Sequence, residues 1–515
     1  MRRGPRLYYA LLLVVVVVVI VFYGCQGVKQ SSSSDPNSPN NPGNPNNPGG
    51  PPSSTPAPPG ASPTPPSSPS DQPGQINHII VFLQENRSFD TYFGNLSAYW
   101  AAHGYPPQPF DGIPLSASNP GCDPSSAATC QVDAGSPVIN VFHLKTMCIE
   151  LAEPSWDYAR RDFNRADPAN GPPTLDGFAA SAGVLARLAP KSFHDFVGRR
   201  AMGYYDGNDL NYYYFMASNF ATSDRWFSPV GALTQPNRMY LLAATSHGHA
   251  YPLGTTHSPP LSNKTIFQLL EENGISWKIY AHPLGDGCDN FSCLMMQSYI
   301  NMFTFQNDIQ SKFPQNLAPI AQYFTDLANG TLPQVAFIEA ASDEGLDEHP
   351  SELTAVNIQA GARYASTLIN ALMHSGAWVD SAFILSFDEF GGTYDHVAPQ
   401  PAVSPDGIAP TDLLPGDVCT HGGGAHCNFT ETGYRVPLIV ISPYTKRNYV
   451  SHTVADYTAI LKFIETRFNL PSLTARDAAQ MDMSEFFDMA NPPWMTPPSP
   501  PAQNTGGACY LDHLP

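Results

Sequence analysis

The sequence predicts an α/β fold built on a mostly parallel central sheet. Several short apolar runs lack the polar alternation of half-exposed strands, which is typical of strands buried on both faces of a parallel sheet. These candidate strands are residues 76–83, 276–281, 334–340, 381–387 and 436–442. Because amphipathic segments separate them along the chain, the order of elements indicates strands and helices packed in layers.

The first 25 residues are expected to form a lipoprotein-type signal peptide. A basic start, "MRRGPRLYY", leads into the apolar run "ALLLVVVVVVIVFYGC", which ends at Gly24 and Cys25. A small residue before a lone cysteine resembles the bacterial lipobox, in which cleavage makes Cys25 the lipidated N-terminus. An uncleaved anchor is the alternative, but about 16 apolar residues fall short of the roughly 20 that span a bilayer. We therefore expect an exported protein anchored to a membrane, in the periplasm or at the cell surface.

Residues 26–75 are expected to be a disordered tether. They consist almost entirely of Pro, Ser, Asn and Gly, and so few apolar side chains do not offset the entropy of ordering the chain. Pro-rich segments favour extended conformations and act as semi-rigid spacers. Residues 76–515 have a globular composition, and we expect them to form the functional domain.

Three segments near the candidate strands have helical character: residues 263–274, 352–376 and 454–468. Gly274 and Gly376 end the first two segments. Glycine adopts the left-handed backbone of a helix C-cap without strain, so both helices are expected to stop there.

Nine cysteines occur, and removal of the lipidated Cys25 leaves an even eight. Exported chains oxidise their thiols, so disulfides are expected. Close spacing suggests Cys122 with Cys130, Cys288 with Cys293 and Cys419 with Cys427, which leaves Cys148 with Cys509. Sequence alone does not fix this connectivity. A zinc cluster is the competing hypothesis, but the chain contains no CxxC pair.

The chain is acidic, with 25 Lys and Arg against 44 Asp and Glu and a formal net charge of -19. Nucleic-acid binding depends on neutralising phosphates with Lys and Arg. No basic stripe is present, so a nucleic-acid partner is disfavoured. An anionic substrate would need local positive charge, from a metal ion or from a few arginines.

Three candidate strands are followed at once by residue types that bind cations or phosphate. Glu85 and Asn86 follow the strand at 76–83. The other residues of this kind are Asp343, Glu344, Asp347, Glu348 and His349 after residues 334–340, and Asp388, Glu389, Asp395 and His396 after residues 381–387. Ligands of open α/β sheets lie outside the carboxyl ends of the strands, so these groups are expected to converge on one crevice.

Converging carboxylates repel one another unless a cation lies among them. Oxygen ligands with imidazole suit one or more divalent ions such as Mg, Ca, Mn or Zn, and the sequence does not select among them. A single acidic residue after a strand is more often a solvated turn or a helix N-cap, and this alternative applies to Glu85 taken alone. Asp388 and Glu389 are more specific, because Gly391 and Gly392 follow them and allow close backbone approach to a ligand.

Several segments resemble those of a known family. They are "ENRSFDTYFG", "MGYYDGNDLNYYYFMASNFATSDRWF", "TQPNRMYLLAAT", "TIFQLLEENGISWKIY", "DEHPSE", "FILSFDEFGGTYDHV" and "YRVPLIVISP". From Asn77 to about Leu470 they keep the order found in the bacterial phosphoesterase family of nonspecific phospholipases C and related acid phosphatases. This family belongs to the alkaline phosphatase superfamily. The resemblance therefore implies a three-layer α/β/α sandwich, a metal-assisted nucleophile and a covalent phospho-enzyme intermediate.

The resemblance also implies site residues. The Glu-Asn and Asp-Glu pairs of the family hold the metal, and they correspond here to Glu85, Asn86, Asp388 and Glu389. The motif that supplies the nucleophile has the local form "LTQPNR", which makes Thr234 the candidate nucleophile and a further metal ligand. Threonine resembles the phospholipase branch, whereas the acid phosphatase branch has serine there. Without the resemblance, Thr234 would be an ordinary turn residue.

Other residues are expected to help with the chemistry. Metal coordination is one way to activate a hydroxyl, and a transferring phosphoryl group is stabilised mainly by positioning and electrostatics. Asn237 and Arg238 lie beside the nucleophile in sequence and are expected to bind the substrate. His349, in the Glu-His-Pro motif, is expected to protonate the leaving oxygen or to contact the phosphate. His396 is a further candidate for substrate binding, with a bond to Asp395 as the alternative.

The chain also departs from the family pattern. Glu153 replaces the histidine of a Pro-His-Ser-Trp motif, and Arg160 replaces another histidine four residues after the tryptophan. Residues 456–459 read Asp-Tyr-Thr-Ala where Asp-His-Thr-Ser is expected, with His452 one helical turn away as a candidate substitute. Arg160 is expected either to contact phosphate or to lie on a solvated surface. These departures concern the phosphate-contacting histidines and leave the metal ligands and the nucleophile in place.

The most specific functional expectation is phospholipase C-type cleavage of a phospholipid on the glycerol side of the phosphate. A broad-specificity acid phosphatase acting on small phosphate esters is the first alternative, and an inactive surface binding protein on the same fold is the second. The aromatic run at residues 204–220 is expected either to line an entrance for an apolar substrate tail or to form core. The sequence determines neither the metal nor the oligomeric state.

Overall fold

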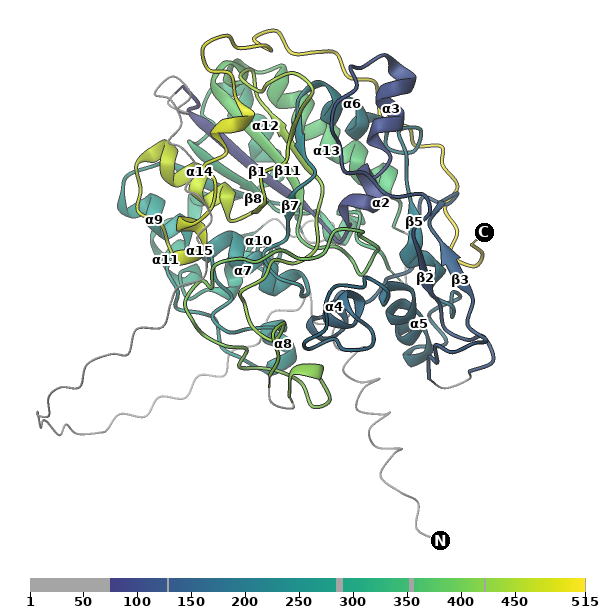
Figure 1. The fold of residues 1–515 in the computed structure, drawn as a ribbon. Coiled ribbons are helices and arrows are strands. Elements are labelled where there is room, and N and C mark those ends of the chain that lie inside the picture. The colour runs from purple at the N-terminus through teal and green to yellow at the C-terminus, as the bar shows by residue number, and fades with distance from the viewer. Residues whose placement is uncertain (1–74, 127–128, 284–289, 352–355, 421–422, 515) are drawn as a thin grey trace, which may run out of the picture.

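The computed structural model describes residues 75–126, 129–283, 290–351, 356–420 and 423–514 (Figure 1). The signal peptide expected over residues 1–25 and the tether expected over residues 26–75 lie outside these ranges, except for Gln75. Within the described ranges, no helix is both long enough and apolar enough to cross a membrane.

An eight-stranded sheet forms the centre of the body (Figure 1). Its strands, in spatial order, are β13 (Tyr449–Ser451), β6 (Ala221–Ser223), β12 (Leu438–Ile441), β11 (Ser381–Phe387), β1 (His78–Gln84), β10 (Val335–Ile338), β8 (Trp277–Ala281) and β9 (Leu317–Pro319). The strands from β11 through β1, β10 and β8 to β9 are parallel, whereas β12 is antiparallel to both β11 and β6. The five predicted strands are β1, β8, β10, β11 and β12, and the predicted mostly parallel sheet is confirmed.

Strand β1 lies between β11 and β10, with Val81 paired to Ile384 on one side and to Phe337 on the other. Every residue of β1 after His78 is buried. A strand that is hydrogen bonded along both edges and covered on both faces must be apolar on both faces, which explains its unbroken apolar sequence. The strand ends at Gln84, so the polar residues that follow lie at the carboxyl edge of the sheet.

The other elements surround this sheet. The helices are α2 (Phe89–Phe93), α3 (Leu96–His103), α4 (Trp156–Phe163), α5 (Phe178–Leu188), α6 (Asn211–Asn219), α7 (Thr234–Ala243), α8 (Leu253–Thr256), α9 (Ile266–Glu272), α10 (Phe291–Met296), α11 (Gln306–Lys312), α12 (Ile320–Asn329), α13 (Ile358–Met373), α14 (Ala459–Phe468) and α15 (Ala475–Ala478). Short 3-10 helices are η2 (Arg199–Met202), η3 (Tyr299–Met302), η4 (Pro314–Asn316), η5 (Ser342–Glu344), η6 (Gly376–Asp380), η7 (Val418–Thr420) and η8 (Ser484–Phe486). Small two-stranded sheets pair β14 (Ala455–Asp456) with β7 (Trp226–Phe227), β2 (Ser118–Pro120) with β3 (Val138–Asn140) and β4 (Phe142–His143) with β5 (Gly203–Tyr204).

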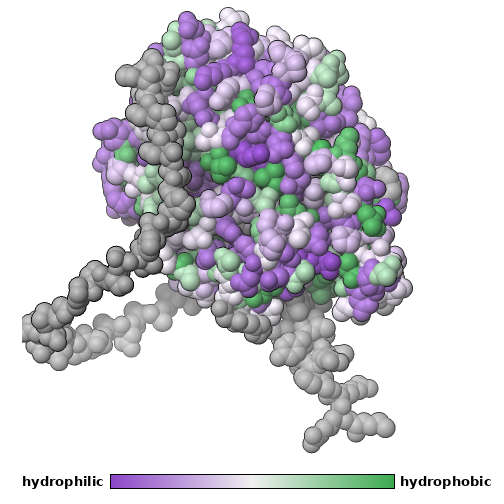
Figure 2. Space-filling model, viewed as in Figure 1, coloured by the Kyte–Doolittle hydropathy of each residue, from purple (hydrophilic) through white to green (hydrophobic). Residues whose placement is uncertain are grey.

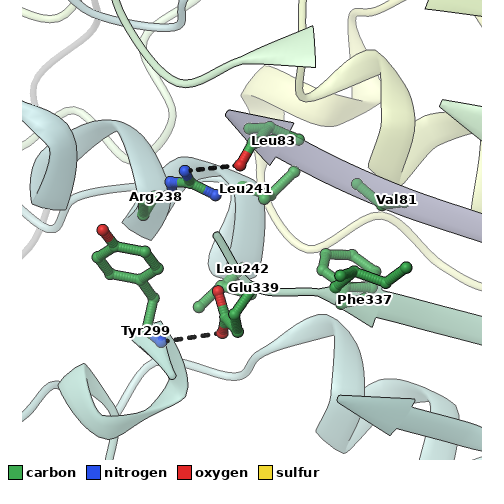
Figure 3. Close-up of a pocket in the computed structure, with 9 residues that line it drawn as sticks. Val81, Leu83, Arg238, Leu241, Leu242, Tyr299, Phe337 and Glu339 are labelled. Atoms are coloured by element: carbon green, nitrogen blue, oxygen red, sulfur yellow. Dashed lines mark hydrogen bonds between the residues drawn. The ribbon is translucent and has the colours of Figure 1, made fainter. Parts of the chain in front are cut away.

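Helices cover both faces of the sheet. On one face, Phe82 of β1 packs against Tyr364 of α13, with ring centroids 6.0 Å apart. On the other face, Val81 and Leu83 line a small pocket with Leu241 of α7 (Figure 3). Successive side chains of a strand point to opposite faces, so α13 and α7 lie on opposite sides of β1. Since α6 and α12 pack with α13, and α9 packs with α7, the molecule is the expected three-layer α/β/α sandwich.

Helix α9 agrees with the prediction for residues 263–274. The side chain of Thr265 caps its start by accepting a hydrogen bond from the Gln268 N–H. Gly274 follows its end with φ +68°, as expected of a glycine that terminates a helix.

The two other predicted helices are shorter than expected. Helix α13 begins at Ile358, where the Asn357 side chain caps it, and its C-cap is His374. Gly376 therefore does not end the helix and instead begins η6. Helix α14 covers only the second part of residues 454–468, because residues 455–456 pair with β7 as strand β14.

The disulfides include Cys122–Cys130, Cys148–Cys509 and Cys419–Cys427, which are pairs that the spacing suggested. The suggested pair of Cys288 with Cys293 lies outside the described residues, because Cys288 is not among them. Cys148–Cys509 joins positions 361 residues apart. It attaches the Pro-rich C-terminal segment to the body.

The aromatic run at residues 204–220 is part of the core. Tyr205, Tyr212, Tyr213, Tyr214 and Phe220 are all fully buried. The hypothesis that these rings line a substrate entrance is therefore wrong, and the alternative is correct. Their role is to fill the space between the sheet and the helices on the α13 side.

Candidate active site

Polar segments meet at the carboxyl ends of three neighbouring strands. Glu85 and Asn86 follow β1, Asp388 follows β11, and the loop containing Asp347 follows β10. The Asn86 backbone N–H donates to Asp388 Oδ1 at 3.0 Å, and the Glu85 backbone N–H donates to the Asp347 carbonyl at 2.9 Å. The predicted convergence is confirmed for the ends of these strands, but not for Asp395 and His396, which lie in a separate cluster. Glu344 is exposed and does not take part.

The backbone around these residues is unusually close-packed. Asn86 has φ +59°, a left-handed conformation that few residues other than glycine adopt. Gly391, with φ +70°, lies so near that a Cβ atom there would clash with the Asn86 carbonyl oxygen. Gly392, with φ +68°, approaches the backbone of Glu153 in the same way. These glycines therefore permit close approach to the protein's own backbone, whereas the approach to a ligand that the sequence suggests stays a prediction.

Thr234 is the first residue of α7 and is half-buried. Its hydroxyl lies 3.1 Å from Glu85 Oε2 and 3.4 Å from Asn86 Oδ1, and it can donate to either oxygen. The first N–H groups of a helix have no intrahelical partner, and they carry the positive end of the helix dipole. An anionic group bound at Thr234 would therefore lie in a favourable field.

Glu85 is a buried anion. Its Oε1 atom accepts hydrogen bonds from Arg238 Nη2 and from the Tyr299 hydroxyl, both at 2.9 Å. Burial by itself would raise the pKa of Glu85, but the positive charge of Arg238 and these hydrogen bonds bring it below its ordinary value. Glu85 is only 3% exposed, and the N-cap of α2 is Ser88. The alternatives of a solvated turn or a helix cap are therefore wrong for Glu85.

Asp388 and Glu389 are fully buried, and each has an unsatisfied oxygen. Asp388 Oδ2 and Glu389 Oε1 have no hydrogen-bond partner among the described residues. Burial, and to a smaller extent the negative charge of Glu85, raises the pKa of Asp388 well above its ordinary value. Burial, and to a smaller extent the negative charge of Asp388, likewise raises the pKa of Glu389. A cation bound to these oxygens would remove that penalty, because it stabilises the charged carboxylates.

These residues offer oxygens of the kind that bind a divalent metal ion, but Glu85, Asp388 and Glu389 are not among the described acidic groups whose ligand atoms lie within 4.8 Å of one another. Their role as ligands stays a prediction. Glu85, Asn86 and Thr234 bring side-chain oxygens to within hydrogen-bonding distance of one another. Asp388 and Glu389 add buried oxygens without a hydrogen-bond partner in the described part of the chain, with Arg238 Nε 3.5 Å from Asp388 Oδ2. An all-oxygen set of this kind suits hard divalent cations.

His349 lies beside Asn86. Its Nε2 atom is 3.0 Å from Asn86 Nδ2, and its Nδ1 atom is 2.5 Å from the Pro350 carbonyl oxygen. An amide nitrogen only donates, so Nε2 must accept and Nδ1 must carry the ring proton. This bond holds the amide nitrogen of Asn86 toward His349 and leaves the amide oxygen toward Thr234.

Asn237 and Arg238, expected to bind substrate, are both engaged by the protein. Asn237 Oδ1 accepts from the Val230 N–H at 3.2 Å, and its Nδ2 donates to the Ala232 carbonyl at 2.8 Å. Asn237 therefore shapes the loop that leads to Thr234. Arg238 is buried, lies 4.7 Å from the centre of the Tyr299 ring, and donates to the Leu83 carbonyl (Figure 3). Both residues support the site from within the protein.

His396 belongs to a separate cluster. Its ring nitrogens bond to Asp90 Oδ2 at 2.7 Å and to Asp111 Oδ1 at 3.0 Å. Asp395 instead accepts from Arg435 Nε at 2.9 Å. His396 thus has carboxylate partners other than Asp395, so the alternative bond to Asp395 is wrong. The role of His396 in substrate binding stays a prediction.

Two groups of acidic and histidine side chains have the spacing of metal ligands. They are Asp90, Asp395 and His396, and His143, Asp206 and Asp209. Arg435 bonds to both acidic residues of the first group, and Lys145 Nζ lies 2.7 Å from His143 Nδ1 in the second. Each group thus has a cationic side chain beside it, as Glu85 and Asp388 have in Arg238.

The positions that depart from the family pattern have structural roles. Arg160 is buried, and its Nη1 donates to the Trp156 and Gly231 carbonyls at 2.8 and 2.9 Å. Burial lowers the pKa of Arg160 to about 10. The hypothesis of a solvated Arg160 is therefore wrong, and its donors hold the loop before Thr234. His452 is half-exposed and bonds to Asp224 Oδ1 at 2.8 Å.

Two tyrosines contact the site without having been predicted. The Tyr299 hydroxyl donates to Glu85, and the Tyr457 hydroxyl donates to the Asp388 carbonyl at 3.1 Å. Tyr457 stands where the family pattern has histidine, so the departure itself marked the position. Tyr299 carries no local signal, because its partner is 214 residues away in the sequence.

The fold and the site together define an α/β/α enzyme whose polar groups lie at the carboxyl edge of its sheet. The sequence pattern of the Phosphoesterase family matches residues 76–471. The protein belongs to this family, and it is a hydrolase acting on phosphate esters.

Curated relatives cover most of the chain. Phospholipase C B of Mycobacterium tuberculosis is 29% identical over 81% of this chain and 78% of its own length. Non-specific phospholipase C1 of Arabidopsis thaliana is 28% identical over 82% of this chain and 72% of its own. Non-hemolytic phospholipase C of Burkholderia pseudomallei is 27% identical over 82% of this chain and 61% of its own. Among solved structures, one described as "Crystal structure of Ps i-CgsB" has 13% identity and a TM-score of 0.29, over 53% of this chain and 69% of that chain.

Proposed function

We propose that the protein is a metal-dependent phospholipase C in which Thr234 is the nucleophile and a phosphorylated Thr234 is the intermediate. The contact of the Thr234 hydroxyl with Glu85 and Asn86, at 3.1 and 3.4 Å, supports this proposal most strongly. The names of the relatives support a phospholipid as the substrate.

Glu85, Asn86, Thr234, Asp388 and Glu389 would hold the divalent ion. When bound, the ion supplies positive charge that favours the ionised form of a threonine hydroxyl and balances the charge of a phosphoryl group. The N-terminus of α7 adds a favourable field at the same place. Arg238 keeps Glu85 ionised and fixed in position.

The reaction has two displacements at phosphorus. In the first, Thr234 Oγ1 bonds to phosphorus and the bond from phosphorus to the glycerol oxygen breaks. Thr234 loses its hydroxyl proton, and the glycerol oxygen of the departing diacylglycerol gains one. In the second, the oxygen of a water molecule bonds to the same phosphorus and the bond from phosphorus to Thr234 Oγ1 breaks. The OH of the water stays on the phosphorylated head group, and its remaining hydrogen returns to Thr234 Oγ1. His349 is the imidazole that we assign to these proton movements, for which its Nε2 atom must first release the Asn86 amide that it accepts in the resting site.

We further propose that the protein works outside the cytoplasm, anchored by a lipid on Cys25 and held away from the membrane by the tether at residues 26–75. The disulfides support an oxidising compartment, because such bonds are rare in reducing ones. Residues 76–515 then form the single phosphoesterase domain.

The substrate class is tested with purified protein, p-nitrophenyl phosphorylcholine, phosphatidylcholine and p-nitrophenyl phosphate. Hydrolysis of the two choline esters, with loss of activity on chelation and recovery on adding a divalent ion, is the expected result. Hydrolysis of the monoester alone would instead indicate a phosphatase. Absence of turnover on all three substrates, at every divalent ion tried, would indicate a binding protein on the same fold.

The nucleophile is tested with Thr234→Ala and Thr234→Ser. The alanine variant is expected to lose at least about a thousandfold in kcat, because the covalent route has no other hydroxyl at this position. The serine variant keeps a hydroxyl and should retain measurable activity. Trapped phosphoenzyme, seen by intact-mass spectrometry after acid quenching, should disappear in the alanine variant. An alanine variant with most of the wild-type activity would rule out Thr234 as the nucleophile.

A further inference from the structure

Glu348 is a fully buried carboxyl group next to His349 in the loop after β10. Three donors from three different segments hold it. The Tyr92 hydroxyl of α2 donates at 2.5 Å, the Tyr213 hydroxyl of α6 at 2.6 Å, and Gln84 Nε2 of β1 at 3.0 Å. Glu348 therefore connects this loop to α2, to α6 and to the end of β1, the strand that carries the site.

The backbone at Glu348 is left-handed, with φ +71°. A residue with a side chain keeps this conformation only where its surroundings impose it, and such positions concentrate at functional sites. Gly361 of α13 packs directly on the side chain, since a Cβ atom there would clash with Glu348 Cγ. Hydrogen bonds and close packing together thus fix both the side chain and the backbone of Glu348.

The rest of this loop is tied to the end of β1. Gln84 Nε2 donates to the Leu346 carbonyl at 3.1 Å as well as to Glu348. The Glu85 backbone N–H donates to the Asp347 carbonyl at 2.9 Å. Successive residues at the end of β1 therefore bond to successive residues of the loop, and the last of these bonds joins Asn86 to His349.

We propose that Glu348 is a positioning residue of the active site. It fixes the left-handed turn that directs His349 at Asn86, and His349 in turn keeps the Asn86 side-chain oxygen toward Thr234. Glu348 touches neither the proposed ligands nor Thr234, and it acts through His349. The catalytic consequence rests on the function proposed above for Asn86 and Thr234. The geometric part of the proposal, that Glu348 orients His349, does not rest on the proposed function.

The chain offers a matched set of variants. Tyr92→Phe and Tyr213→Phe each remove one donor to Glu348 without removing a ring from the core. Tyr212→Phe is the control, because Tyr212 lies next to Tyr213 in α6, is equally buried, and donates instead to Asn370 Oδ1 at 2.9 Å. A general effect of losing a buried hydroxyl would appear in all of them.

The kinetic readout is kcat against KM for the ester that the wild type hydrolyses. Tyr213→Phe and the double variant Tyr92→Phe/Tyr213→Phe are expected to lower kcat about 10- to 100-fold, with KM within about twofold, as is usual when groups that orient a site are disturbed. Tyr212→Phe should stay within about twofold of wild type in both. Wild-type kcat in the double variant would overturn the proposal.

A second readout does not need activity. In protein labelled with ¹⁵N-histidine, the side-chain signals of His349, identified by their loss in His349→Gln, should show the proton on Nδ1 in the wild type and in Tyr212→Phe. The double variant should show mixed tautomers or a broadened signal. An unchanged signal in the double variant, or a wild-type proton on Nε2, would overturn the proposal. If the wild type hydrolyses no phosphate ester, the proposed function fails, and this spectrum alone decides the role of Glu348.

Discussion

At the scale of single residues, Glu348 links burial to pH dependence. Burial, opposed by hydrogen bonds from Tyr213 and Tyr92 and by the charge of Arg87, raises the pKa of Glu348 to about 7. An unfolded glutamate titrates near pH 4.3. Between these two values the folded chain binds more protons than the unfolded chain. The stability contribution of Glu348 therefore falls as the pH rises from about 4.3 to about 7, and it is complete below that window.

Glu348→Gln removes this titration, because the amide is neutral at every pH. Relative to wild type, the free energy of unfolding of the variant is expected to increase by about 3 kcal/mol between about pH 4 and about pH 8. Any loss from altered hydrogen bonds is a constant offset. Denaturant unfolding at both pH values measures the difference. Glu344→Gln, at an exposed glutamate of the same loop, is the control, and equal pH dependence in all three proteins would contradict the assignment.

At the scale of elements, the turn after β11 determines how the two carboxylate pairs meet. Strands β1 and β11 are parallel neighbours, with Gln84 paired to Phe387. Their next residues therefore emerge side by side, and the turn must leave room for both. The two positive-φ glycines that follow Glu389 provide that room.

Gly391→Ala is expected to disturb this element. A left-handed alanine costs about 1 kcal/mol, and the clash with the Asn86 carbonyl adds about 1–3 kcal/mol. Activity should also fall, because the shift displaces Asn86. Gly407→Ala is the control, since Gly407 has φ +73° but nothing within 4 Å of a Cβ position. Its cost should be about 1 kcal/mol with full activity. Thermal unfolding and turnover measure both variants, and equal losses in the two would show that the close approach is unimportant.

At the scale of the whole molecule, the acidic composition of the chain does not favour electrostatic attachment to an anionic membrane. Acidic residues exceed basic ones by 44 to 25, and hydrophobic residues on the face shown in Figure 2 form small groups among hydrophilic ones. Several arginines are fully buried, namely Arg87, Arg200, Arg238, Arg435 and Arg476. Binding to anionic lipids needs clusters of exposed basic side chains, and these five buried arginines cannot contribute to one.

The C-terminal segment depends on its disulfide for attachment over a long range. Cys148–Cys509 closes a separation of 361 residues, whereas Cys419–Cys427 closes one of 8. Loop-closure entropy makes the longer link more stabilising, so Cys148→Ser/Cys509→Ser should lose about 2–5 kcal/mol and more than Cys419→Ser/Cys427→Ser. Thermal unfolding under oxidising conditions compares the two double variants. A smaller loss in the first would show that backbone bonds such as Met147 N–H to the Ala508 carbonyl suffice to hold the segment.

Much of the fold could be predicted from local sequence. The strands β1, β8, β10, β11 and β12 are mostly apolar runs, as burial on both faces requires. Lys278 of β8 is an exception, and it pairs with Asp326. The ends of α13 and α14 were less predictable. A tertiary pairing converts residues 455–456 to a strand, and nothing in the local apolar pattern records it.

The candidate site was predictable to the same extent. Glu85, Asn86, Asp388 and Glu389 could be grouped because each pair directly follows a buried strand, and parallel neighbours end at the same edge. Thr234 required the family resemblance, since its contact with Glu85 spans 149 residues. Asn237 and Arg238 were correctly placed near the nucleophile, but their burial and their bonds to the loop and to Glu85 depend on packing.

The sequence by itself determined the layered α/β class, the edge of the sheet at which polar groups gather, and the family. These properties follow from apolar runs and from residue order, which are local. Only the tertiary structure decided which polar groups face one another: His396 with Asp90, Arg160 with the loop before Thr234, and Glu348 with Tyr213, 135 residues away. The physical reason is that a buried polar group must find a partner among whatever the packing of distant elements brings to it.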